Sequence, residues 1–211
     1  SAPLMAWALE HDIVILHTND IHCGINDNIG FAGLAQIKKD ALARTPNVAL
    51  VDAGDAIQGA PIGKLSRGLA VVDIMNYLGY DFCIPGNHEF DYGMDRFLEL
   101  VPLQRAGYYC ANFVYAGNNK QVLPGYKIMQ YEDTKVAFVG ASTPESLTTS
   151  TPTFFQNEKG KYIYSFCEDK TGNKLYKQLQ KNVDKARKDG ADYVFIVGHL
   201  GMDGTTPQWS S

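Results

Sequence analysis

The sequence has no large excess of one charge, no long apolar run and no closely spaced pair of cysteines. Lysine and arginine number 19 against 23 aspartate and glutamate residues, a net charge of −4, so we expect no nucleic-acid polymer as a partner. The apolar runs, such as 193–197, are only long enough for strands, so no segment is expected to span a membrane. Four cysteines without a CxxC pair argue against a zinc knuckle or a thioredoxin-type site.

What remains is an ordinary globular composition, with 45% hydrophobic and 20% charged residues. The 211 residues suit one domain, or about one and a half at roughly 150 residues each. The first residues, SAPLMAWALE, have no basic region and too short an apolar stretch for an intact signal peptide. We therefore expect residues 1–11 to be a tag remnant or the flank of a removed signal, and residues 12–211 to form the domain.

Strand-like and helix-like segments alternate along the chain. β-branched and apolar runs predict strands over 12–17, 48–51, 82–84, 126–131, 136–140 and 193–197. Apolar residues at helical spacing predict helices over 31–44, 70–78, 95–103 and 173–188. We expect a hairpin over 126–140 and a loop over 142–154. The alternation predicts an α/β fold, and the hairpin makes the sheet mixed.

Four of the predicted strands are each followed by a polar cluster. Asp20-Ile21-His22 follows the first, Asp55 the second, the segment 86–91 (GNHEFD) the third and the segment 198–201 (GHLG) the last. Because ligands of open α/β sheets bind at the carboxyl ends of parallel strands, we expect these clusters to converge.

The side chains in these clusters are ligands for divalent metals such as zinc, manganese or iron. Alternation places Asp20 and His22 on one side of the chain if it stays extended. Asp55 follows a glycine, which allows a sharp turn and leaves the carboxylate free to bridge two ions. Asn87 offers a neutral carbonyl oxygen. Two ions about 4 Å apart would clamp the attacking and leaving oxygens of a phosphoryl transfer.

Each cluster alone has a structural alternative. A Gly-Asp pair after a strand is often a turn or a helix N-cap, and His199 could be a hydrogen-bonded histidine at a strand end. The occurrence of all four clusters together favours the metal site. His17, inside the first strand, is expected in the core or next to the site. Cys23, although adjacent to His22, is expected to be a buried free thiol and not a soft ligand.

The motifs LHTNDIHCG (16–24), DAGDAIQGAPIG (52–63), PGNHEFDYG (85–93) and GHLG (198–201) resemble those of the calcineurin-like metallophosphoesterases, in particular the 5′-nucleotidase / UDP-sugar hydrolase branch. The resemblance extends from about residue 13 onward. It implies an αββα sandwich with mixed sheets and hydrolysis of phosphate esters of nucleotides. Alternatives within the branch are a UDP-sugar hydrolase and a 2′,3′-cyclic nucleotide phosphodiesterase.

The resemblance also implies two divalent ions, zinc, manganese or similar. Asp20 and His22 would bind the first, Asn87 and His199 the second, and Asp55 would bridge both.

His88 is not a ligand in this family. It would stabilise the transition state or protonate the leaving group, and Asp91 would hold its imidazole.

Two features depart from the family pattern. None of the five histidines lies beyond His199, so the later GH-x-H or GH-x-Q motif that completes the two metal spheres is missing. The C-terminal domain that binds the nucleobase is missing too. We therefore expect a catalytic domain incomplete at its C-terminus and inactive or nearly so alone; the competing hypothesis is a non-catalytic binding module with a degenerate metal site. Relatives are mostly exported, which implies a periplasmic or cell-surface location.

Overall fold

The computed structural model describes residues 10–201, so the predicted flank over 1–11 falls almost wholly outside the described residues. At the start of the described chain, the Glu10 N–H donates to the Glu132 carboxylate (2.8 Å), and the imidazole of His11 lies 2.9 Å from it. Among residues 10–201, no helix combines the length and the apolar character needed to cross a bilayer.

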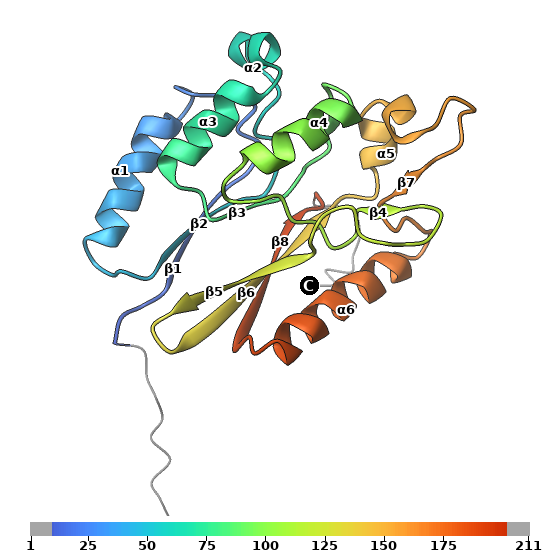
Figure 1. Ribbon diagram of the computed structural model, residues 1–211. Helices are drawn as coiled ribbons and strands as arrows, with labels where there is room; N and C mark the ends of the chain where they lie inside the picture. Colours follow the sequence, from blue (N-terminus) through green and yellow to red (C-terminus); the bar gives the residue numbers. More distant parts are fainter. Residues whose placement is uncertain (1–9, 202–211) are drawn as a thin grey trace, which may run out of the picture.

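The first sheet is parallel and positions three of the four polar clusters. Its strands β1 (Val14–Thr18), β2 (Val48–Asp52) and β3 (Phe82–Cys83) lie side by side in that order. Helices α1 (Gly30–Leu42) and α3 (Leu69–Leu78) connect consecutive strands and cover one face (Figure 1). All five residues of β2 are buried, as expected for the central strand of a sheet covered on both faces.

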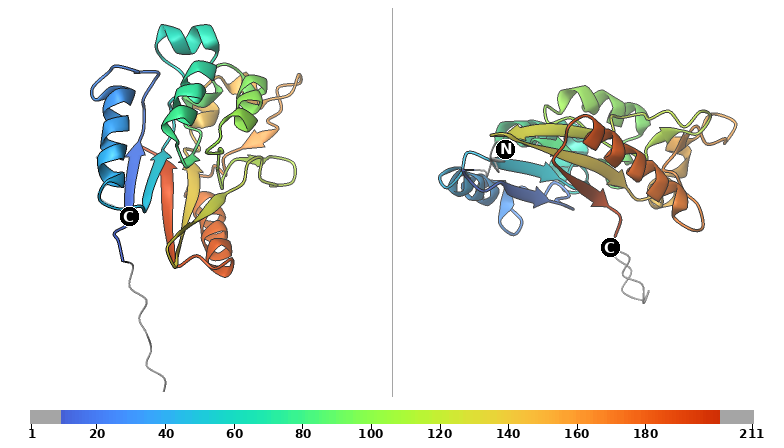
Figure 2. Two further views of the ribbon diagram at one scale, coloured as in Figure 1. Left: turned by 60° about the vertical axis from the view of Figure 1, so that its left-hand side comes forward. Right: turned by 90° about the horizontal axis from the view of Figure 1, so that it is seen from below.

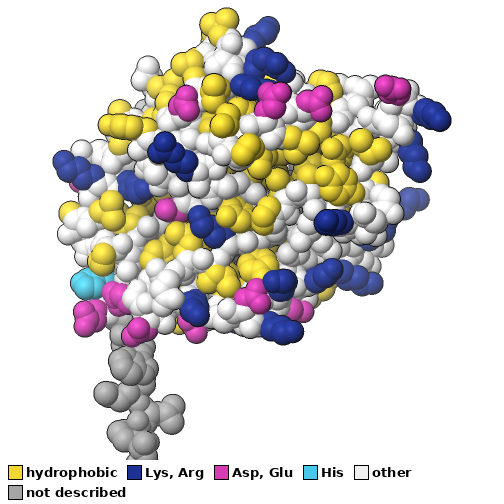
Figure 3. All heavy atoms as spheres, in the orientation of Figure 1, with side chains coloured by type: hydrophobic (Ala, Val, Ile, Leu, Met, Phe, Trp, Pro, Cys, Tyr) yellow, Lys and Arg dark blue, Asp and Glu magenta, His cyan; other side chains and the backbone are white. Residues whose placement is uncertain are grey.

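The second sheet is mixed. Strands β5 (Tyr126–Tyr131) and β6 (Thr134–Ser142) form the predicted hairpin, and β8 (Tyr193–His199) pairs parallel to β6. Helix α6 (Asn173–Lys188) packs against this sheet through Ala186 and presents its lysines to solvent, along the lower right of the face in Figure 3. A small antiparallel pair, β4 (Val114–Tyr115) with β7 (Tyr164–Ser165), lies apart from both sheets.

The two sheets pack face to face and form the middle layers of an αββα sandwich. The left view of Figure 2 shows the layers in the order α1, first sheet, second sheet and α6. Apolar side chains from both sheets fill the space between them: Ala49, Val51, Phe82, Ile84, Tyr131, Val136, Phe138 and Val197. Each fully buried Val or Phe contributes roughly 1.5–3 kcal/mol, so this contact fixes how the strand ends meet. The predicted fold class is confirmed.

Several predicted elements differ in detail. The predicted loop 142–154 contains the short helix α5 (Ser146–Thr149) and the start of a 3₁₀ turn, Pro152–Phe155. The helix predicted over 95–103 is divided into α4 (Met94–Leu100) and a 3₁₀ turn (Val101–Leu103), because Pro102 lacks the N–H that would continue the α-helix. Helix α2 (Pro61–Ser66) was not predicted.

The last strand is less buried than its apolar sequence suggests. Within residues 10–201, β8 has a hydrogen-bonded neighbour on one side only. Tyr193, Phe195 and Ile196 remain 58%, 45% and 51% exposed. His17 on β1 is also exposed, so a place in the core, one of its two predicted places, is wrong.

Candidate metal centre

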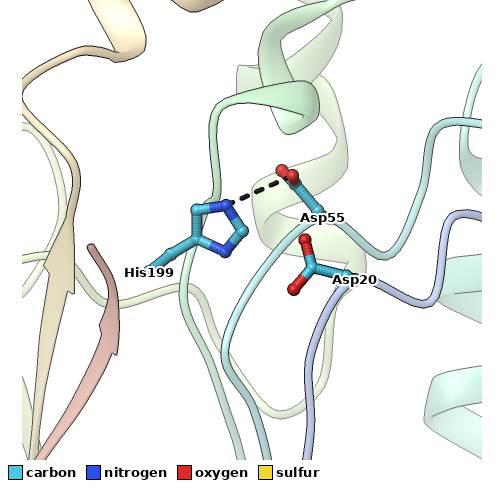
Figure 4. Close-up of side chains that lie close together, drawn as sticks. All are labelled: Asp20, Asp55 and His199. Atoms are coloured by element: carbon cyan, nitrogen blue, oxygen red, sulfur yellow. Dashed lines mark ion pairs between the residues drawn. The ribbon is translucent and has the colours of Figure 1, made fainter. Parts of the chain in front are cut away.

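The polar clusters converge at the carboxyl ends of β1, β2, β3 and β8, as predicted. Asp20 lies in the loop after β1, Asp55 in the loop after β2, and His199 is the last residue of β8. One ligand atom from each of these three lies within 4.8 Å of the others (Figure 4). Packing of the two sheets brings His199 to this place, although 144 residues separate it from Asp55 in the sequence.

The loop after β2 turns sharply at Gly54 and Asp55. Their φ angles are 95° and 60°, both in the left-handed region. The Gly54 N–H donates to the buried carboxylate of Asp52 at 3.0 Å, which stabilises the turn. A Cβ on Gly54 would lie 2.5 Å from the backbone nitrogen of Gly86, so only glycine fits here. The sharp turn predicted at this glycine is confirmed.

The loop after β1 does not continue the strand. Asp20 and His22 have φ angles of 52° and 47°, so the expectation that an extended chain aligns them is wrong. Instead, the loop after β1 runs alongside the loop after β2 and is hydrogen-bonded to it. The N–H groups of Asp20, His22 and Cys23 donate to the carbonyls of Gly54, Asp55 and Ala56, each at 2.9 Å. The side chains meet nevertheless: His22 Nε2 lies 3.8 Å from Asp20 and 3.9 Å from Asp55.

Both His22 and His199 are oriented through their Nδ1 atoms. His22 Nδ1 lies 3.2 Å from the carbonyl oxygen of Gln58, and His199 Nδ1 lies 2.9 Å from that of Ala53. Because a carbonyl oxygen only accepts, each Nδ1 carries a proton, and each Nε2 faces the carboxylates. A ring N–H donated to a backbone carbonyl is the usual support of a metal-binding histidine.

Asn87 lies next to His199. Its Oδ1 is 3.2 Å from His199 Nε2, which is also 3.2 Å from Asp55 Oδ2. The amide oxygen of Asn87 and the carboxylate of Asp55 thus lie at the same distance from the imidazole nitrogen of His199.

His88 and Asp91 form a pair at the edge of this group. His88 Nδ1 lies 2.7 Å from Asp91 Oδ2, and Ser150 Oγ donates to the other oxygen of Asp91 at 3.2 Å. The His88 ring is 5.2 Å from the ring of His22. Asp91 therefore fixes the orientation of a histidine that stands beside the clustered ligands.

The charges of the group perturb its titration. Hydrogen bonding to Asp55 is the main reason that the pKa of His199 is raised to about 9. Burial raises the pKa of Asp55, but hydrogen bonds from His199 and from the His88 N–H outweigh it, and the net pKa is lowered. For His88 the effects are opposite in sign: burial lowers its pKa, but the hydrogen bond to Asp91 and the nearby carboxylates raise the pKa overall.

The donor set fits divalent metals. It offers two carboxylates, two imidazoles with Nε2 directed inward and one amide oxygen, from Asp20, Asp55, His22, His199 and Asn87. Zinc and manganese both accept such oxygen and nitrogen ligands.

Cys23 is not part of this set. Its side chain is 1% exposed, and burial raises the pKa of its thiol to about 11. All four cysteines are free thiols, and three of them are buried.

Glu89 was not predicted to be functional, although it lies within the GNHEFD motif. Its carboxylate is 1% exposed and accepts backbone N–H groups from two of the loops that carry ligands, those after β2 and β3. The signal available in the sequence was an acidic residue placed between the candidate catalytic residue His88 and the apolar Phe90.

The sequence matches the calcineurin-like phosphoesterase family over residues 13–211. It is 29% identical to a snake venom 5′-nucleotidase from Gloydius brevicauda, over 95% of this chain and 35% of the relative. It is 26% identical to the 2′,3′-cyclic-nucleotide 2′-phosphodiesterase/3′-nucleotidase of Haemophilus influenzae, over 90% of this chain and 31% of that protein.

The solved structure of a 5′-nucleotidase precursor from Thermus thermophilus superposes with a TM-score of 0.74 at 25% identity, covering 90% of this chain and 37% of that one. The chain thus spans about a third of the length of these relatives. Motifs, fold and sequence match agree, and the chain belongs to the calcineurin-like phosphoesterase family.

Proposed function

We propose that the chain is the metal-binding part of a phosphoesterase that hydrolyses phosphate esters of nucleotides, as 5′-nucleotidases do. The observation that carries the proposal is the pair of histidines, His22 and His199, each with Nδ1 on a backbone carbonyl and Nε2 facing Asp55. The nucleotide-processing relatives support the substrate class.

Five side chains hold the metals in this proposal. Asp20 and His22 would hold one divalent ion, Asn87 and His199 would hold a second, and Asp55 would contribute to both. When bound, the ions would supply positive charge for the phosphoryl oxygens and would lower the pKa of a water, so that hydroxide is available as the nucleophile.

His88 acts on the leaving group. Its Nδ1–H donates to Asp91, so Nε2 is the atom that exchanges a proton with the substrate. The hydrogen bond to Asp91 and the nearby carboxylates raise the pKa of His88 above that of free histidine. His88 therefore delivers a proton to the departing oxygen, and the Asp91 carboxylate stabilises the charged ring before the transfer.

We further propose that residues 12–211 belong to a catalytic domain whose remaining ligands and nucleobase-binding domain lie in a longer polypeptide. This chain alone then binds metal weakly, because affinity depends on ligand number, and turns over little substrate. The relation to a snake venom protein supports a location outside the cytoplasm, which fractionation of the source cells would test.

Metal titration and a substrate panel test the proposal. Calorimetry with Mn²⁺ or Zn²⁺ on the 211-residue chain should show binding that is lost in Asp55→Ala. In a polypeptide long enough to be active, hydrolysis of a nucleoside 5′-monophosphate, measured as phosphate release, should be fastest. It should exceed hydrolysis of a UDP-sugar, measured as UMP formation, and of a 2′,3′-cyclic nucleotide, measured as formation of the 3′-nucleotide. Activity that survives unchanged in both Asp55→Ala and His88→Ala would exclude the mechanism.

One alternative of another class is a binding module with a degenerate site. It predicts no phosphate release from any length of the polypeptide. Tight binding of two ions with turnover would exclude it.

A further inference from the structure

Glu89 is a buried carboxylate that the proposed mechanism does not use. It is 1% exposed, and none of the ion pairs found among residues 10–201 involves it. A buried charge without a cation is costly unless hydrogen bonds compensate for it. Its surroundings must therefore supply donors.

Four backbone N–H groups do so. Oε2 accepts from Asp55 (2.7 Å) and Gly86 (2.6 Å), and Oε1 accepts from Ala56 (2.8 Å) and Ile57 (3.4 Å). Only a carboxylate matches this arrangement, because both of its oxygens accept. A glutamine in its place has one accepting oxygen and would direct an NH₂ group at backbone N–H groups.

The four donors come from two different loops. Residues 55–57 follow β2, whereas Gly86 follows β3 and directly precedes Asn87. A further hydrogen bond runs from the loop after β3 to the loop after β2, because Asp55 Oδ1 accepts the backbone N–H of His88 at 2.8 Å. Glu89 and Asp55 thus join the two loops by bonds in both directions. The loops are close enough that a Cβ on Gly86 would overlap Asp55 Oδ1.

We propose that Glu89 is a positioning residue that sets the separation between Asp55 and Asn87, so that both side chains reach the same ion. The inference rests on the proposed function, since it assigns these two side chains to metal. Substitutions of groups that support metal ligands typically lower metal affinity 10–100-fold, and we expect a loss of that size in Glu89→Gln.

Asn47→Asp is the matched control. Asn47 is 4% exposed and lies at the amino end of β2, opposite the site; its Nδ2 donates to the His11 carbonyl (3.3 Å) and to Glu132 (2.9 Å). Like Glu89→Gln, this isosteric exchange places the wrong hydrogen-bonding group in a buried network. Both variants should therefore lower the melting temperature, and only Glu89→Gln should weaken metal binding.

The experiment has two readouts on the whole chain. The first is the ¹H–¹⁵N spectrum of the metal-free protein, in which Glu89→Gln should shift the amides of Asp55, Ala56 and Gly86 and Asn47→Asp should not. The second is calorimetric titration with Mn²⁺ or Zn²⁺ below each melting temperature, in which Asn47→Asp should stay within about twofold of the unsubstituted chain.

Unchanged metal affinity in a folded Glu89→Gln variant overturns the proposal. If that variant does not fold, Glu89→Asp replaces it: it keeps both acceptors but is one methylene shorter, so it should also bind more weakly, and equal affinity again overturns the proposal. If Asp55→Ala leaves metal binding intact, the proposed function itself fails, an outcome distinct from any result at Glu89.

Discussion

The ion pair between His199 and Asp55 makes metal binding depend on a proton. His199 Nε2 lies 3.2 Å from Asp55 Oδ2, and the pKa of His199 is about 9 in the metal-free protein. At pH 7.5 a group of that pKa is about 97% protonated, against about 9% for an ordinary histidine. A histidine ligand must be neutral, so loading the site should release about one proton from His199 instead of about 0.1.

Two measurements test this reasoning. NMR titration of the histidine rings in chelator should give His199 a pKa near 9, assigned by comparison with His199→Gln. Asp55→Asn should return that pKa toward 6.5, because it removes the main cause of the shift. Calorimetry at pH 7.5 in buffers of different ionisation enthalpy counts the released protons. A pKa of His199 near 6.5, or release of no more than about 0.1 proton from it, would refute the argument.

The same pair sets the pH dependence of stability. The pKa of His199 is raised on folding, so its contribution is fully present below about 6.5 and disappears as the pH rises through about 9. Asp55 affects stability in acid. Its pKa is lowered on folding, so its contribution to the free energy of unfolding is lost as the pH falls below 3.8, the ordinary pKa of an aspartate. Urea denaturation in chelator should therefore show a decline in the free energy of unfolding between pH 6.5 and 9.

Three further variants and one control, Gly117→Ala, test the site and its support. Gly86→Ala should weaken metal binding in calorimetry by about 10–100-fold, because its Cβ displaces the Asp55 carboxylate. Gly117→Ala, where a Cβ meets nothing within 4 Å, should not. Phe90→Ala should lower the free energy of unfolding in urea by about 3–5 kcal/mol, since Phe90 is 0% exposed. In an active polypeptide, Asp91→Asn should lower kcat by about 10²–10⁴-fold with metal affinity unchanged, because the carboxylate that orients His88 is lost.

Each of these has a contrary outcome. Equal metal affinity in the two glycine variants would mean that the close approach of the loops does not matter. If Phe90→Ala lowers the free energy of unfolding by less than about 1 kcal/mol, the Phe90 ring is not part of a tightly packed cluster. In the structure this ring contacts those of Phe97, Phe113, Phe155 and Phe166. A joint loss of kcat and metal affinity in Asp91→Asn would give Asp91 a role in holding the metal.

Periodic patterns predicted the elements whose burial follows directly from sequence spacing. Helix α6 was predicted over 173–188 and is found there, because its apolar stripe faces one sheet. The short elements were missed. Helix α2 has six residues and exposes Leu65 to 87%, so no apolar periodicity marks it. The exposure of β8 was also not predictable, because an apolar run does not reveal on how many sides a strand is covered.

For the site, the sequence predicted which residues meet but not the backbone that brings them together. The convergence of Asp20, Asp55 and His199 followed from the position of each at the carboxyl end of a predicted strand. The left-handed conformation of Asp20, His22 and Asp55 did not, because a motif of side chains carries no information on φ. Each such residue costs of order 1–3 kcal/mol, and surrounding contacts must maintain it.

Those contacts join protein atoms to one another and involve no metal ligand atom, which bears on how the site forms. Backbone hydrogen bonds from 20, 22 and 23 to 54, 55 and 56 hold the first loop against the second, and Glu89 holds the second against the third. Ligands fixed in this way lose little conformational freedom when an ion binds, so most of the ordering cost belongs to folding. The binding of an ion should then leave the backbone of the three loops nearly unchanged. Hydrogen exchange of the amides of 55, 56 and 86 should be slow in chelator and change little on metal loading, whereas fast exchange that slows only with metal would mean that the ion organises the loops.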